Sequence, residues 1–275
     1  MILLLGHTGA LGRAIHERVK HGAFLPPDHR ALMTMPPHGL RSIIKSAKGP
    51  IVVNCVAMTG LDACYEHVGE AIVVNRDFPG RIAAAAEYMD RPLIHFSTES
   101  VFACDAPGKL WAPTDEPNPG TMYGRTKTHG ERLAEYHGGK IIRLPLLYGP
   151  TNDKQIVAKL IDRVLNGEEV QAAIDVISTQ VYTPDVAYWL IPVFRGERAL
   201  DPITHLTGPE RISLYHLVRS IAGELGRASL VMPCHASDFP SHEPKPLYGG
   251  LEGIELPSGI GRYAEYLKAR IQNAA

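Results

Sequence analysis

The chain has 275 residues, of which 45% are hydrophobic and 21% are charged, an ordinary composition for a globular protein with one large core. Its formal net charge is -1 and no block of like charge appears, which argues against binding to nucleic acid or an anionic membrane. No apolar run is long enough to span a bilayer, and the run at 1–5 is too short for a signal peptide, so we expect a cytoplasmic protein.

Short apolar runs alternate with helix-length patterns through the first half of the chain. Strands are expected at 2–5, near 23–25, and at 51–55, 93–97 and 141–144. Helices are expected at 10–20, 40–48, 63–89 with a break near Pro79, 123–136 and 154–166. The strand centres are almost entirely apolar, as in a parallel sheet that is covered on both faces. The sequence therefore predicts an α/β fold of right-handed βαβ units.

The pattern changes after about Pro150, where proline-rich loops such as PCHASDFPSHEPKPLYGG appear. Loops of this kind often shape a substrate pocket. Two further helices are expected: 184–194 with Thr183 as its N-cap, and 214–225 between the N-cap Ser213 and Gly226. We expect residues 1–150 to form a nucleotide-binding domain. Residues 151–275 should supply the last sheet elements and a small C-terminal substrate-binding lobe.

Cysteines and histidines give no sign of a metal site. The chain has 13 histidines, and they are scattered. The cysteines, which form no C-x-x-C pair, are Cys55, Cys64, Cys104 and Cys234. We therefore expect reduced thiols and no bound metal.

The opening stretch MILLLGHTGALGRAI places three glycines between the first strand and the first helix. In such a turn Gly6 permits the tight bend, Gly9 lets the backbone approach a pyrophosphate, and Gly12 lets the helix pack closely on the strand. The helix N-terminus adds free N–H groups and the positive end of its dipole. The pattern predicts a dinucleotide site, and a glycine-rich turn without a ligand is the alternative.

The stretch TMYGRTKTHGE places Tyr123 and Lys127 four residues apart, on one face of a predicted helix. A neighbouring ammonium lowers the pKa of a phenol from its usual value of about 10, so Tyr123 is a candidate proton donor to a carbonyl. In HFSTESVF a strand ends in Ser97 and Thr98, whose hydroxyls are candidates to hydrogen-bond the same carbonyl. The alternatives are an exposed helix face and a hydroxyl that caps a loop.

These motifs resemble those of the extended short-chain dehydrogenase/reductases, and among them the dTDP-4-dehydrorhamnose reductase-like nucleotide-sugar reductases. The resemblance is dense from Met1 to Pro150, in LLLGHTGALG, VVNCVAMTGLDAC, AIVVN, HFSTESVF, NPGTMYGRTKTHGE and IIRLPLLYGP, and thin beyond. It implies a Rossmann-like doubly wound parallel sheet, NADPH or NADH as cofactor, and reduction of a keto group on a nucleotide-linked sugar.

By position, the resemblance implies that Thr98, Tyr123 and Lys127 form the catalytic triad, with Lys127 also holding the nicotinamide ribose. It assigns further residues to the cofactor: at the pyrophosphate Gly6, Gly9, Ala10, Leu11 and Gly12, along the path from adenosine to nicotinamide Cys55, Val56 and Ala57, and beside the nicotinamide Pro145.

Several positions depart from the family pattern. Where the family reads Ser-Thr-Asp-Tyr-Val-Phe, this chain has Glu99 and Ser100 in place of the Asp and the aromatic residue. Met58 stands where Tyr or His is usual, Tyr182 replaces a glycine, and Gly249 stands at a serine position. We therefore expect a changed pocket and a changed or modified sugar.

Cofactor preference depends on residues after the second strand. An acidic residue there binds a ribose 2′-OH and favours NAD, whereas an arginine accepts the 2′-phosphate of NADP. Asp28 and Arg30 both follow that strand, and they favour opposite cofactors. The alternative is that both side chains only keep a surface loop solvated. We favour NADPH, with NADH tolerated.

Two other functions are compatible with this scaffold. An epimerase or dehydratase would retain NAD, but such dehydratases carry an acidic pair after the catalytic Thr, and here only Glu99 follows. A non-catalytic regulatory subunit is the other alternative, and the intact Thr98, Tyr123 and Lys127 argue against it. The sequence leaves open the nucleotide, the sugar, the carbon reduced and the oligomeric state, with a homodimer as one option.

Overall fold

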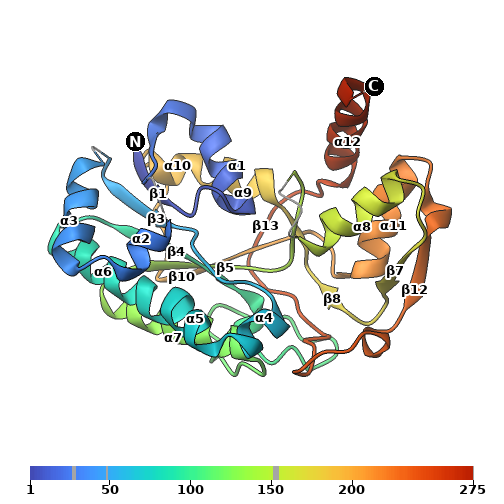
Figure 1. The fold of residues 1–275 in the computed structure, drawn as a ribbon, viewed down its shortest axis with the longest axis horizontal. Helices are drawn as coiled ribbons and strands as arrows, with labels where there is room; N and C mark the ends of the chain where they lie inside the picture. Colours follow the sequence, from blue (N-terminus) through green and yellow to red (C-terminus); the bar gives the residue numbers. More distant parts are fainter. Residues whose placement is uncertain (27–28, 48, 151–154, 275) are drawn as a thin grey trace.

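The computed structural model of the chain describes residues 1–26, 29–47, 49–150 and 155–274. Within these residues a seven-stranded parallel sheet forms the centre of the larger part of the molecule (Figure 1), in the order β13-β10-β5-β4-β3-β1-β2. Its strands are β1 (Ile2–Leu5), β2 (Ala23–Phe24), β3 (Ile51–Asn54), β4 (Leu93–Thr98), β5 (Lys140–Leu144), β10 (Ile203–Thr207) and β13 (Ile254–Glu255). The predicted Rossmann-like parallel sheet is confirmed.

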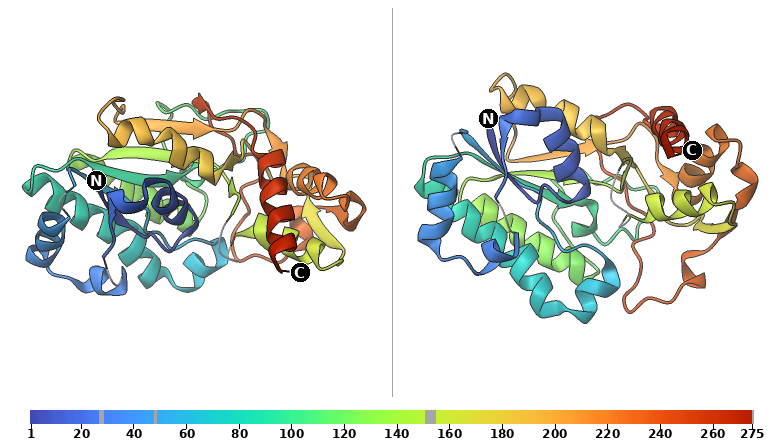
Figure 2. Two further views of the ribbon diagram at one scale, coloured as in Figure 1. Left: turned by 90° about the horizontal axis from the view of Figure 1, so that it is seen from above. Right: turned by 45° about the horizontal axis from the view of Figure 1, so that its top comes forward.

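Helices cover both faces of this sheet (Figure 2). One face packs on α1 (Ala10–Val19), α9 (Thr183–Trp189) and α10 (Ile191–Phe194), and the other on α2 (His29–Thr34), α3 (Pro37–Ser46), α6 (Phe78–Tyr88) and α7 (Met122–Tyr136). Side chains alternate between the two cores, because successive strand residues point to opposite faces. Ile2 and Leu4 pack with α1 and α9, whereas Leu3 and Leu5 pack with α3 and α6.

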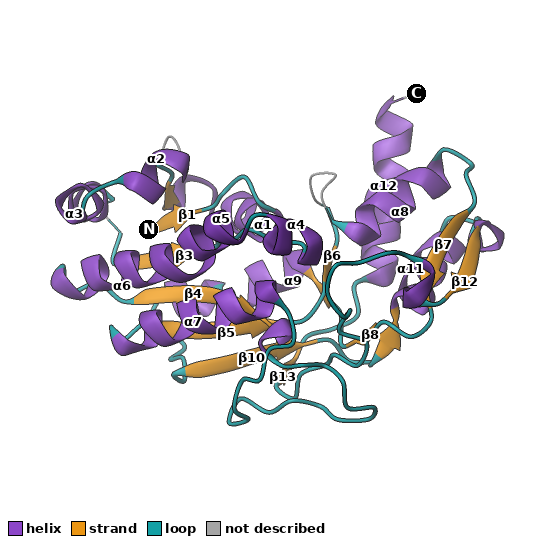
Figure 3. Ribbon diagram, turned by 60° about the horizontal axis from the view of Figure 1, so that its bottom comes forward, coloured by secondary structure: helices purple, strands orange, loops and turns teal. Residues whose placement is uncertain are grey.

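A smaller lobe is built from residues after 155. Its strands β7 (Val170–Ala173) and β12 (Val231–Cys234) pair in parallel, beside α8 (Ile156–Leu165), α11 (Leu214–Glu224) and α12 (Ile260–Ala274). Two short pairs, β6 (Leu147–Tyr148) with β9 (Val181–Tyr182) and β8 (Ile177–Ser178) with β11 (Ile212–Ser213), complete this half. Figure 3 shows β6 and β8 between the sheet and the lobe.

The remaining elements are short. They are α4 (Leu61–Glu66), α5 (Val68–Ile72), a π-helical turn (Val73–Asp77), and 3-10 turns at Lys20–Gly22, Glu99–Val101, Ala228–Leu230 and Ala236–Asp238. In the described parts of the chain, no helix has both the length and the apolar character that crossing a membrane requires.

The helix expected at 63–89, with a break near Pro79, is interrupted at two places. The π-helical turn Val73–Asp77 directly precedes Pro79, which lies in the first turn of α6, and a further interruption falls at His67, between α4 and α5. One prediction about the start of a helix is wrong. Thr183 is not an N-cap, because Tyr182 holds that position and the Thr183 hydroxyl donates to the Tyr148 carbonyl at 3.0 Å.

Other boundaries agree with the sequence analysis. Ser213 caps α11 by accepting a hydrogen bond from the His216 amide at 3.1 Å, and Gly226 follows the helix with a positive φ of 71°. The expected limits Lys48 and Lys154 of two other helices lie outside the described residues.

Candidate active site

The glycine turn connects β1 to α1. Gly6 has a positive φ of 78°, and a Cβ on it would lie 2.8 Å from the Val56 nitrogen. A Cβ on Gly12 would overlap the Gly6 carbonyl oxygen. Gly9 differs, because its φ is -75° and, among the described residues, a Cβ there would meet only the Gly6 oxygen, at an ordinary 3.4 Å. The packing of the protein itself thus explains Gly6 and Gly12, whereas the space beside Gly9 fits the approach of a ligand.

This turn lies at the point where the strand order reverses. β2 and β3 pair with opposite edges of β1, and open α/β sheets bind ligands at such a switch point. Gly9 is the N-cap of α1 and has no side chain that could bond the first N–H groups of the helix, at Ala10 and Leu11. Their surroundings suit a pyrophosphate.

The chain after β3 is held in place beside this turn. The Cys55 amide donates to the Leu5 carbonyl at 3.0 Å, and the Val56 amide donates to the Asn54 side chain at 3.1 Å. Just beyond Ala57, both backbone groups of Met58 bond the side chain of Asn75 at 2.9 Å. The segment expected to lie along the cofactor therefore has a fixed backbone.

Thr98 and Tyr123 meet at the end of β4. Thr98 is the last residue of that strand, and its side chain lies close enough to that of Tyr123 to lower the pKa of the phenol. Tyr123 is the second residue of α7, whose N-terminus lies against the 99–101 turn so closely that a Cβ on Gly124 would overlap the Ser100 carbonyl oxygen. This close approach brings the two hydroxyls together.

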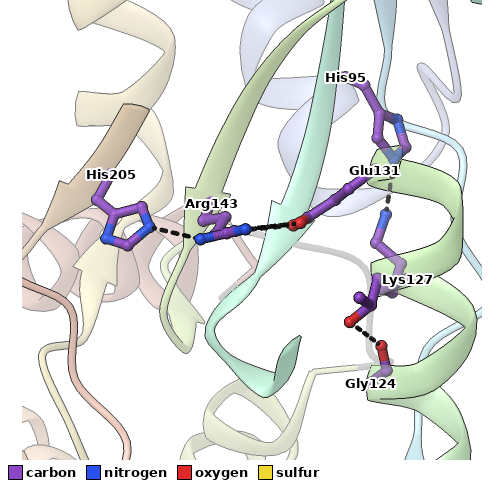
Figure 4. Close-up of polar contacts among 7 residues, drawn as sticks. His95, Gly124, Lys127, Glu131, Arg143 and His205 are labelled. Carbon is purple, nitrogen blue, oxygen red and sulfur yellow. Dashed lines mark hydrogen bonds and ion pairs between the residues drawn. The ribbon is translucent and has the colours of Figure 1, made fainter. Parts of the chain in front are cut away.

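Lys127 is buried one helical turn further along α7 (Figure 4). Its Nζ donates to the Phe96 carbonyl at 2.7 Å and lies 3.3 Å from Nε2 of His95. Burial lowers the pKa of Lys127 to about 8, against the attraction of Glu131. Burial and the Lys127 ammonium together lower the pKa of His95 well below 6.5, so His95 is neutral.

The expected lowering of the Tyr123 pKa by Lys127 is wrong. Enclosure by the surrounding protein raises the pKa of Tyr123 to about 12, and among the described residues only the neighbouring Thr98 side chain opposes this rise. The ammonium is engaged with Phe96 instead. Desolvation outweighs the charge, so Tyr123 holds its proton throughout the neutral range.

A second buried polar group fixes α7 to the sheet. Arg143 on β5 is 1% exposed and donates to Glu131 on α7 from Nε at 3.0 Å and from Nη2 at 2.9 Å. On its other side, Nη1 lies 3.4 Å from Nε2 of His205 on β10 (Figure 4). Burial and the Arg143 cation lower the pKa of His205 to about 4. The helix that carries Tyr123 is therefore bonded to β4 through Lys127 and to β5 through Glu131.

Sequence reasoning missed these supporting residues. The signal was available, because His95 in LIHFST and Arg143 in KIIRL interrupt strands that are otherwise apolar. A polar side chain in a buried strand needs a partner. Pro145 is buried directly after β5, at the sheet edge where β4 and β3 also end.

Asp28 and Arg30 were expected to set the cofactor preference. Asp28 lies outside the described residues, and so does the side chain of Arg30. The cysteines Cys55, Cys64, Cys104 and Cys234 are free thiols. Within the described ranges no three His, Cys, Asp or Glu side chains are grouped so as to hold a metal ion.

Known proteins resemble the chain over most of its length. A family model described as RmlD substrate binding domain matches residues 1–273. A dTDP-4-dehydrorhamnose reductase of Mycolicibacterium smegmatis is 31% identical over 210 residues, 74% of this chain and 62% of that protein. Methionine adenosyltransferase 2 subunit beta of Danio rerio is 28% identical over 241 residues, 80% of this chain and 72% of that protein.

The fold is shared with a solved structure. The dTDP-4-dehydrorhamnose reductase from Bacillus anthracis, in complex with NADP, superimposes with a TM-score of 0.86 over 98% of each chain. The two sequences are 20% identical, so the likeness is one of fold.

Proposed function

The chain belongs to the RmlD substrate binding domain family, and from this premise we propose that it reduces a keto group on a nucleotide-linked sugar with NADPH or NADH. The observation that carries the proposal is the neighbouring pair Thr98 and Tyr123, one helical turn from a buried lysine. The pair lies at the sheet edge that also carries the glycine turn.

The residues present fit a dinucleotide. The open space beside Gly9 and the uncapped start of α1 would take the pyrophosphate, and Lys127 would hold the nicotinamide ribose near Pro145. When it is bound, the nicotinamide supplies the hydride.

Tyr123 is the proposed proton donor. Its raised pKa of about 12 keeps the phenol protonated at neutral pH, which suits an acid that gives its proton to a carbonyl oxygen. The Thr98 hydroxyl would donate a hydrogen bond to the same oxygen and so favour the negative charge that develops there. A charged Lys127 nearby would favour transfer of the phenolic proton.

The test is steady-state oxidation of NADPH and of NADH with a panel of keto nucleotide sugars. Tyr123→Phe removes one oxygen and should lower kcat by about 10²–10⁴-fold, with NADPH affinity retained. Tyr136→Phe, at the end of the same helix with 82% of the side chain exposed, is the matched control and should leave kcat unchanged. Turnover by Tyr123→Phe within twofold of the parent would remove Tyr123 from the reaction.

One comparison favours a second candidate, a regulatory subunit that binds NADPH without turnover, since a relative carries the name methionine adenosyltransferase 2 subunit beta. Dose-dependent NADPH binding with no turnover of any keto sugar would favour this candidate. A homodimer and a cytoplasmic location belong to the proposal as well, tested by light scattering and by cell fractionation.

A further inference from the structure

Glu99 follows Thr98 directly, and its carboxylate is buried where the sheet meets the lobe. The Leu146 amide donates to Oε1 at 3.2 Å, the Gly250 amide donates to Oε2 at 2.8 Å, and the Ser178 hydroxyl lies 2.8 Å from both oxygens. The three donors come from the connection after β5, from β8, and from the loop before β13. One carboxylate thus joins three distant segments to the end of β4.

Gly249 leaves the space that this carboxylate fills. A Cβ on Gly249 would lie 2.6 Å from Oε2 of Glu99 and 2.9 Å from its Cδ. The glycine is itself held, because its amide donates to the Ile177 carbonyl and its carbonyl accepts from Nε of Arg211, both at 2.8 Å. Gly249 is not among the glycines with positive φ, so only the missing side chain distinguishes it.

We propose that Glu99 is a positioning residue, whose carboxylate fastens Leu146, Ser178 and Gly250 to the strand end that carries Thr98. The inference rests on the proposed reductase function, in which the lobe holds the nucleotide sugar. The position of that sugar relative to the Thr98 and Tyr123 hydroxyls then depends on the Glu99 carboxylate.

Among the described residues, three charged or titratable groups face Glu99. The Arg211 cation attracts the carboxylate, and the side chains of Tyr123 and Cys104 lie close enough that the Glu99 charge raises the pKa of each. Burial raises the pKa of Glu99 to about 7, against the three hydrogen bonds and Arg211. Tyr123 and Cys104 stay protonated in this range, so Glu99 is the member of the group that changes charge. A protonated carboxyl accepts fewer hydrogen bonds, so the attachment of Leu146, Ser178 and Gly250 to Glu99 weakens below about pH 7.

Two substitutions test the hydrogen bonds of the Glu99 carboxylate, one at Glu99 itself and one at the glycine beside it. Glu99→Gln keeps the shape but turns one acceptor into an NH₂ donor. Ser178 is able to rotate its hydroxyl, whereas the Leu146 and Gly250 amides are fixed donors, so one of them loses its acceptor. Gly249→Ala leaves Glu99 in place and fills the space of its carboxylate.

The controls are matched to these variants. Gly120→Ala is the control for Gly249→Ala, because a Cβ at this exposed glycine would lie no closer than 3.9 Å to any other part of the described chain. Glu99→Asp in the Gly249→Ala background shortens the acid and vacates the space, so the double variant should recover activity that Gly249→Ala alone has lost.

The measurements are kcat and KM between pH 6 and 9, together with amide hydrogen exchange of the intact protein at pH 8. We expect Glu99→Gln and Gly249→Ala to raise KM for the sugar at least tenfold, with NADPH affinity and the Gly120→Ala control within twofold of the parent. The acid limb of kcat/KM near pH 7 should disappear in Glu99→Gln. Peptides that contain Leu146 and Gly250 should exchange faster in Glu99→Gln than in the parent.

Hydrogen exchange separates this inference from the proposed function. Parental exchange at Leu146 and Gly250 in Glu99→Gln, or a parental pH profile, would overturn the positioning role. If Glu99→Gln does not fold, the comparison of Gly249→Ala with the double variant Gly249→Ala/Glu99→Asp decides in its place. A double variant that recovers no activity would contradict the inference. If the parent protein turned over no keto sugar, the proposed reductase function would be wrong. Amide hydrogen exchange of Glu99→Gln against the parent would still decide whether Glu99 holds the lobe to the sheet.

Discussion

Replacing Lys127 by Met should remove a pH-dependent penalty from the stability of the protein. Lys127 is 1% exposed, and burial lowers its pKa from 10.5 to about 8. Burial therefore disfavours the ammonium by about 3 kcal/mol, at about 1.4 kcal/mol for each step of 1 in pKa. The unfolded chain binds the lysine proton up to about pH 10.5 and the folded chain only to about pH 8. The free energy of unfolding therefore rises between these pH values as the penalty is relieved.

Lys127→Met has no proton to lose and should lack this rise. Relative to the parent, its free energy of unfolding should be higher at pH 7 than at pH 10.5 by about 3 kcal/mol. The lost bond to the Phe96 carbonyl lowers stability at both pH values by about 1–3 kcal/mol, so the pH dependence is the diagnostic quantity. The same variant should lose both kcat and NADPH affinity, because its ammonium has two proposed roles.

Urea unfolding followed by circular dichroism at pH 7, 8, 9 and 10 measures this difference. Lys268→Met, on the exposed side of α12, controls for loss of a lysine elsewhere on the molecule. A difference between Lys127→Met and the parent that does not change with pH would refute the reasoning, because a buried ammonium must contribute a pH-dependent term.

Three further outcomes are expected. NADPH should raise the melting temperature of the parent but not of Gly9→Val, whose branched side chain fills the proposed pyrophosphate space; an equal shift in both would make Gly9 only a turn residue. Glu131→Ala leaves Arg143 buried without its counter-charge and should cost about 3–5 kcal/mol in urea unfolding, and a loss below about 1 kcal/mol would contradict the buried pair. The kcat/KM of the free enzyme should peak between the pKa values of Glu99, about 7, and Lys127, about 8, and a flat profile from pH 6 to 9 would exclude both as essential groups.

The first half of the fold was predictable because local pattern determines it. Apolar runs and capping residues placed β1, β4, β5 and α7 within one or two residues of their observed limits. The sequence analysis did not place β10, β13 or α12. β13 has two residues, both exposed, and exists only because Ile254 pairs with Leu206, a contact that no local pattern encodes.

The sequence motif of the candidate site was predictable, but the burial and the contacts of its side chains were not. The spacing of Tyr123 and Lys127 indicated their shared helix face, but the direction of the Tyr123 pKa depends on burial, which tertiary packing decides. Glu99 and Gly249 were both visible as departures from the family pattern. Their contact, across 150 positions of sequence, appears only in the folded chain, where the glycine makes room for the carboxylate.

The order in which the sheet is assembled has a consequence during synthesis on the ribosome. β5 pairs on one side with β4, which precedes it, and on the other with β10, where Ile141 faces Ile203. Ile203 follows Ile141 by 62 positions, which take roughly 3–12 s to emerge at about 5–20 residues per second. For that interval the mostly apolar strand KIIRL has an unpaired edge, which is a template for pairing with another chain. We expect nascent chains stalled before residue 203 to associate with one another or with chaperones, and the completed strand β10 to end that exposure.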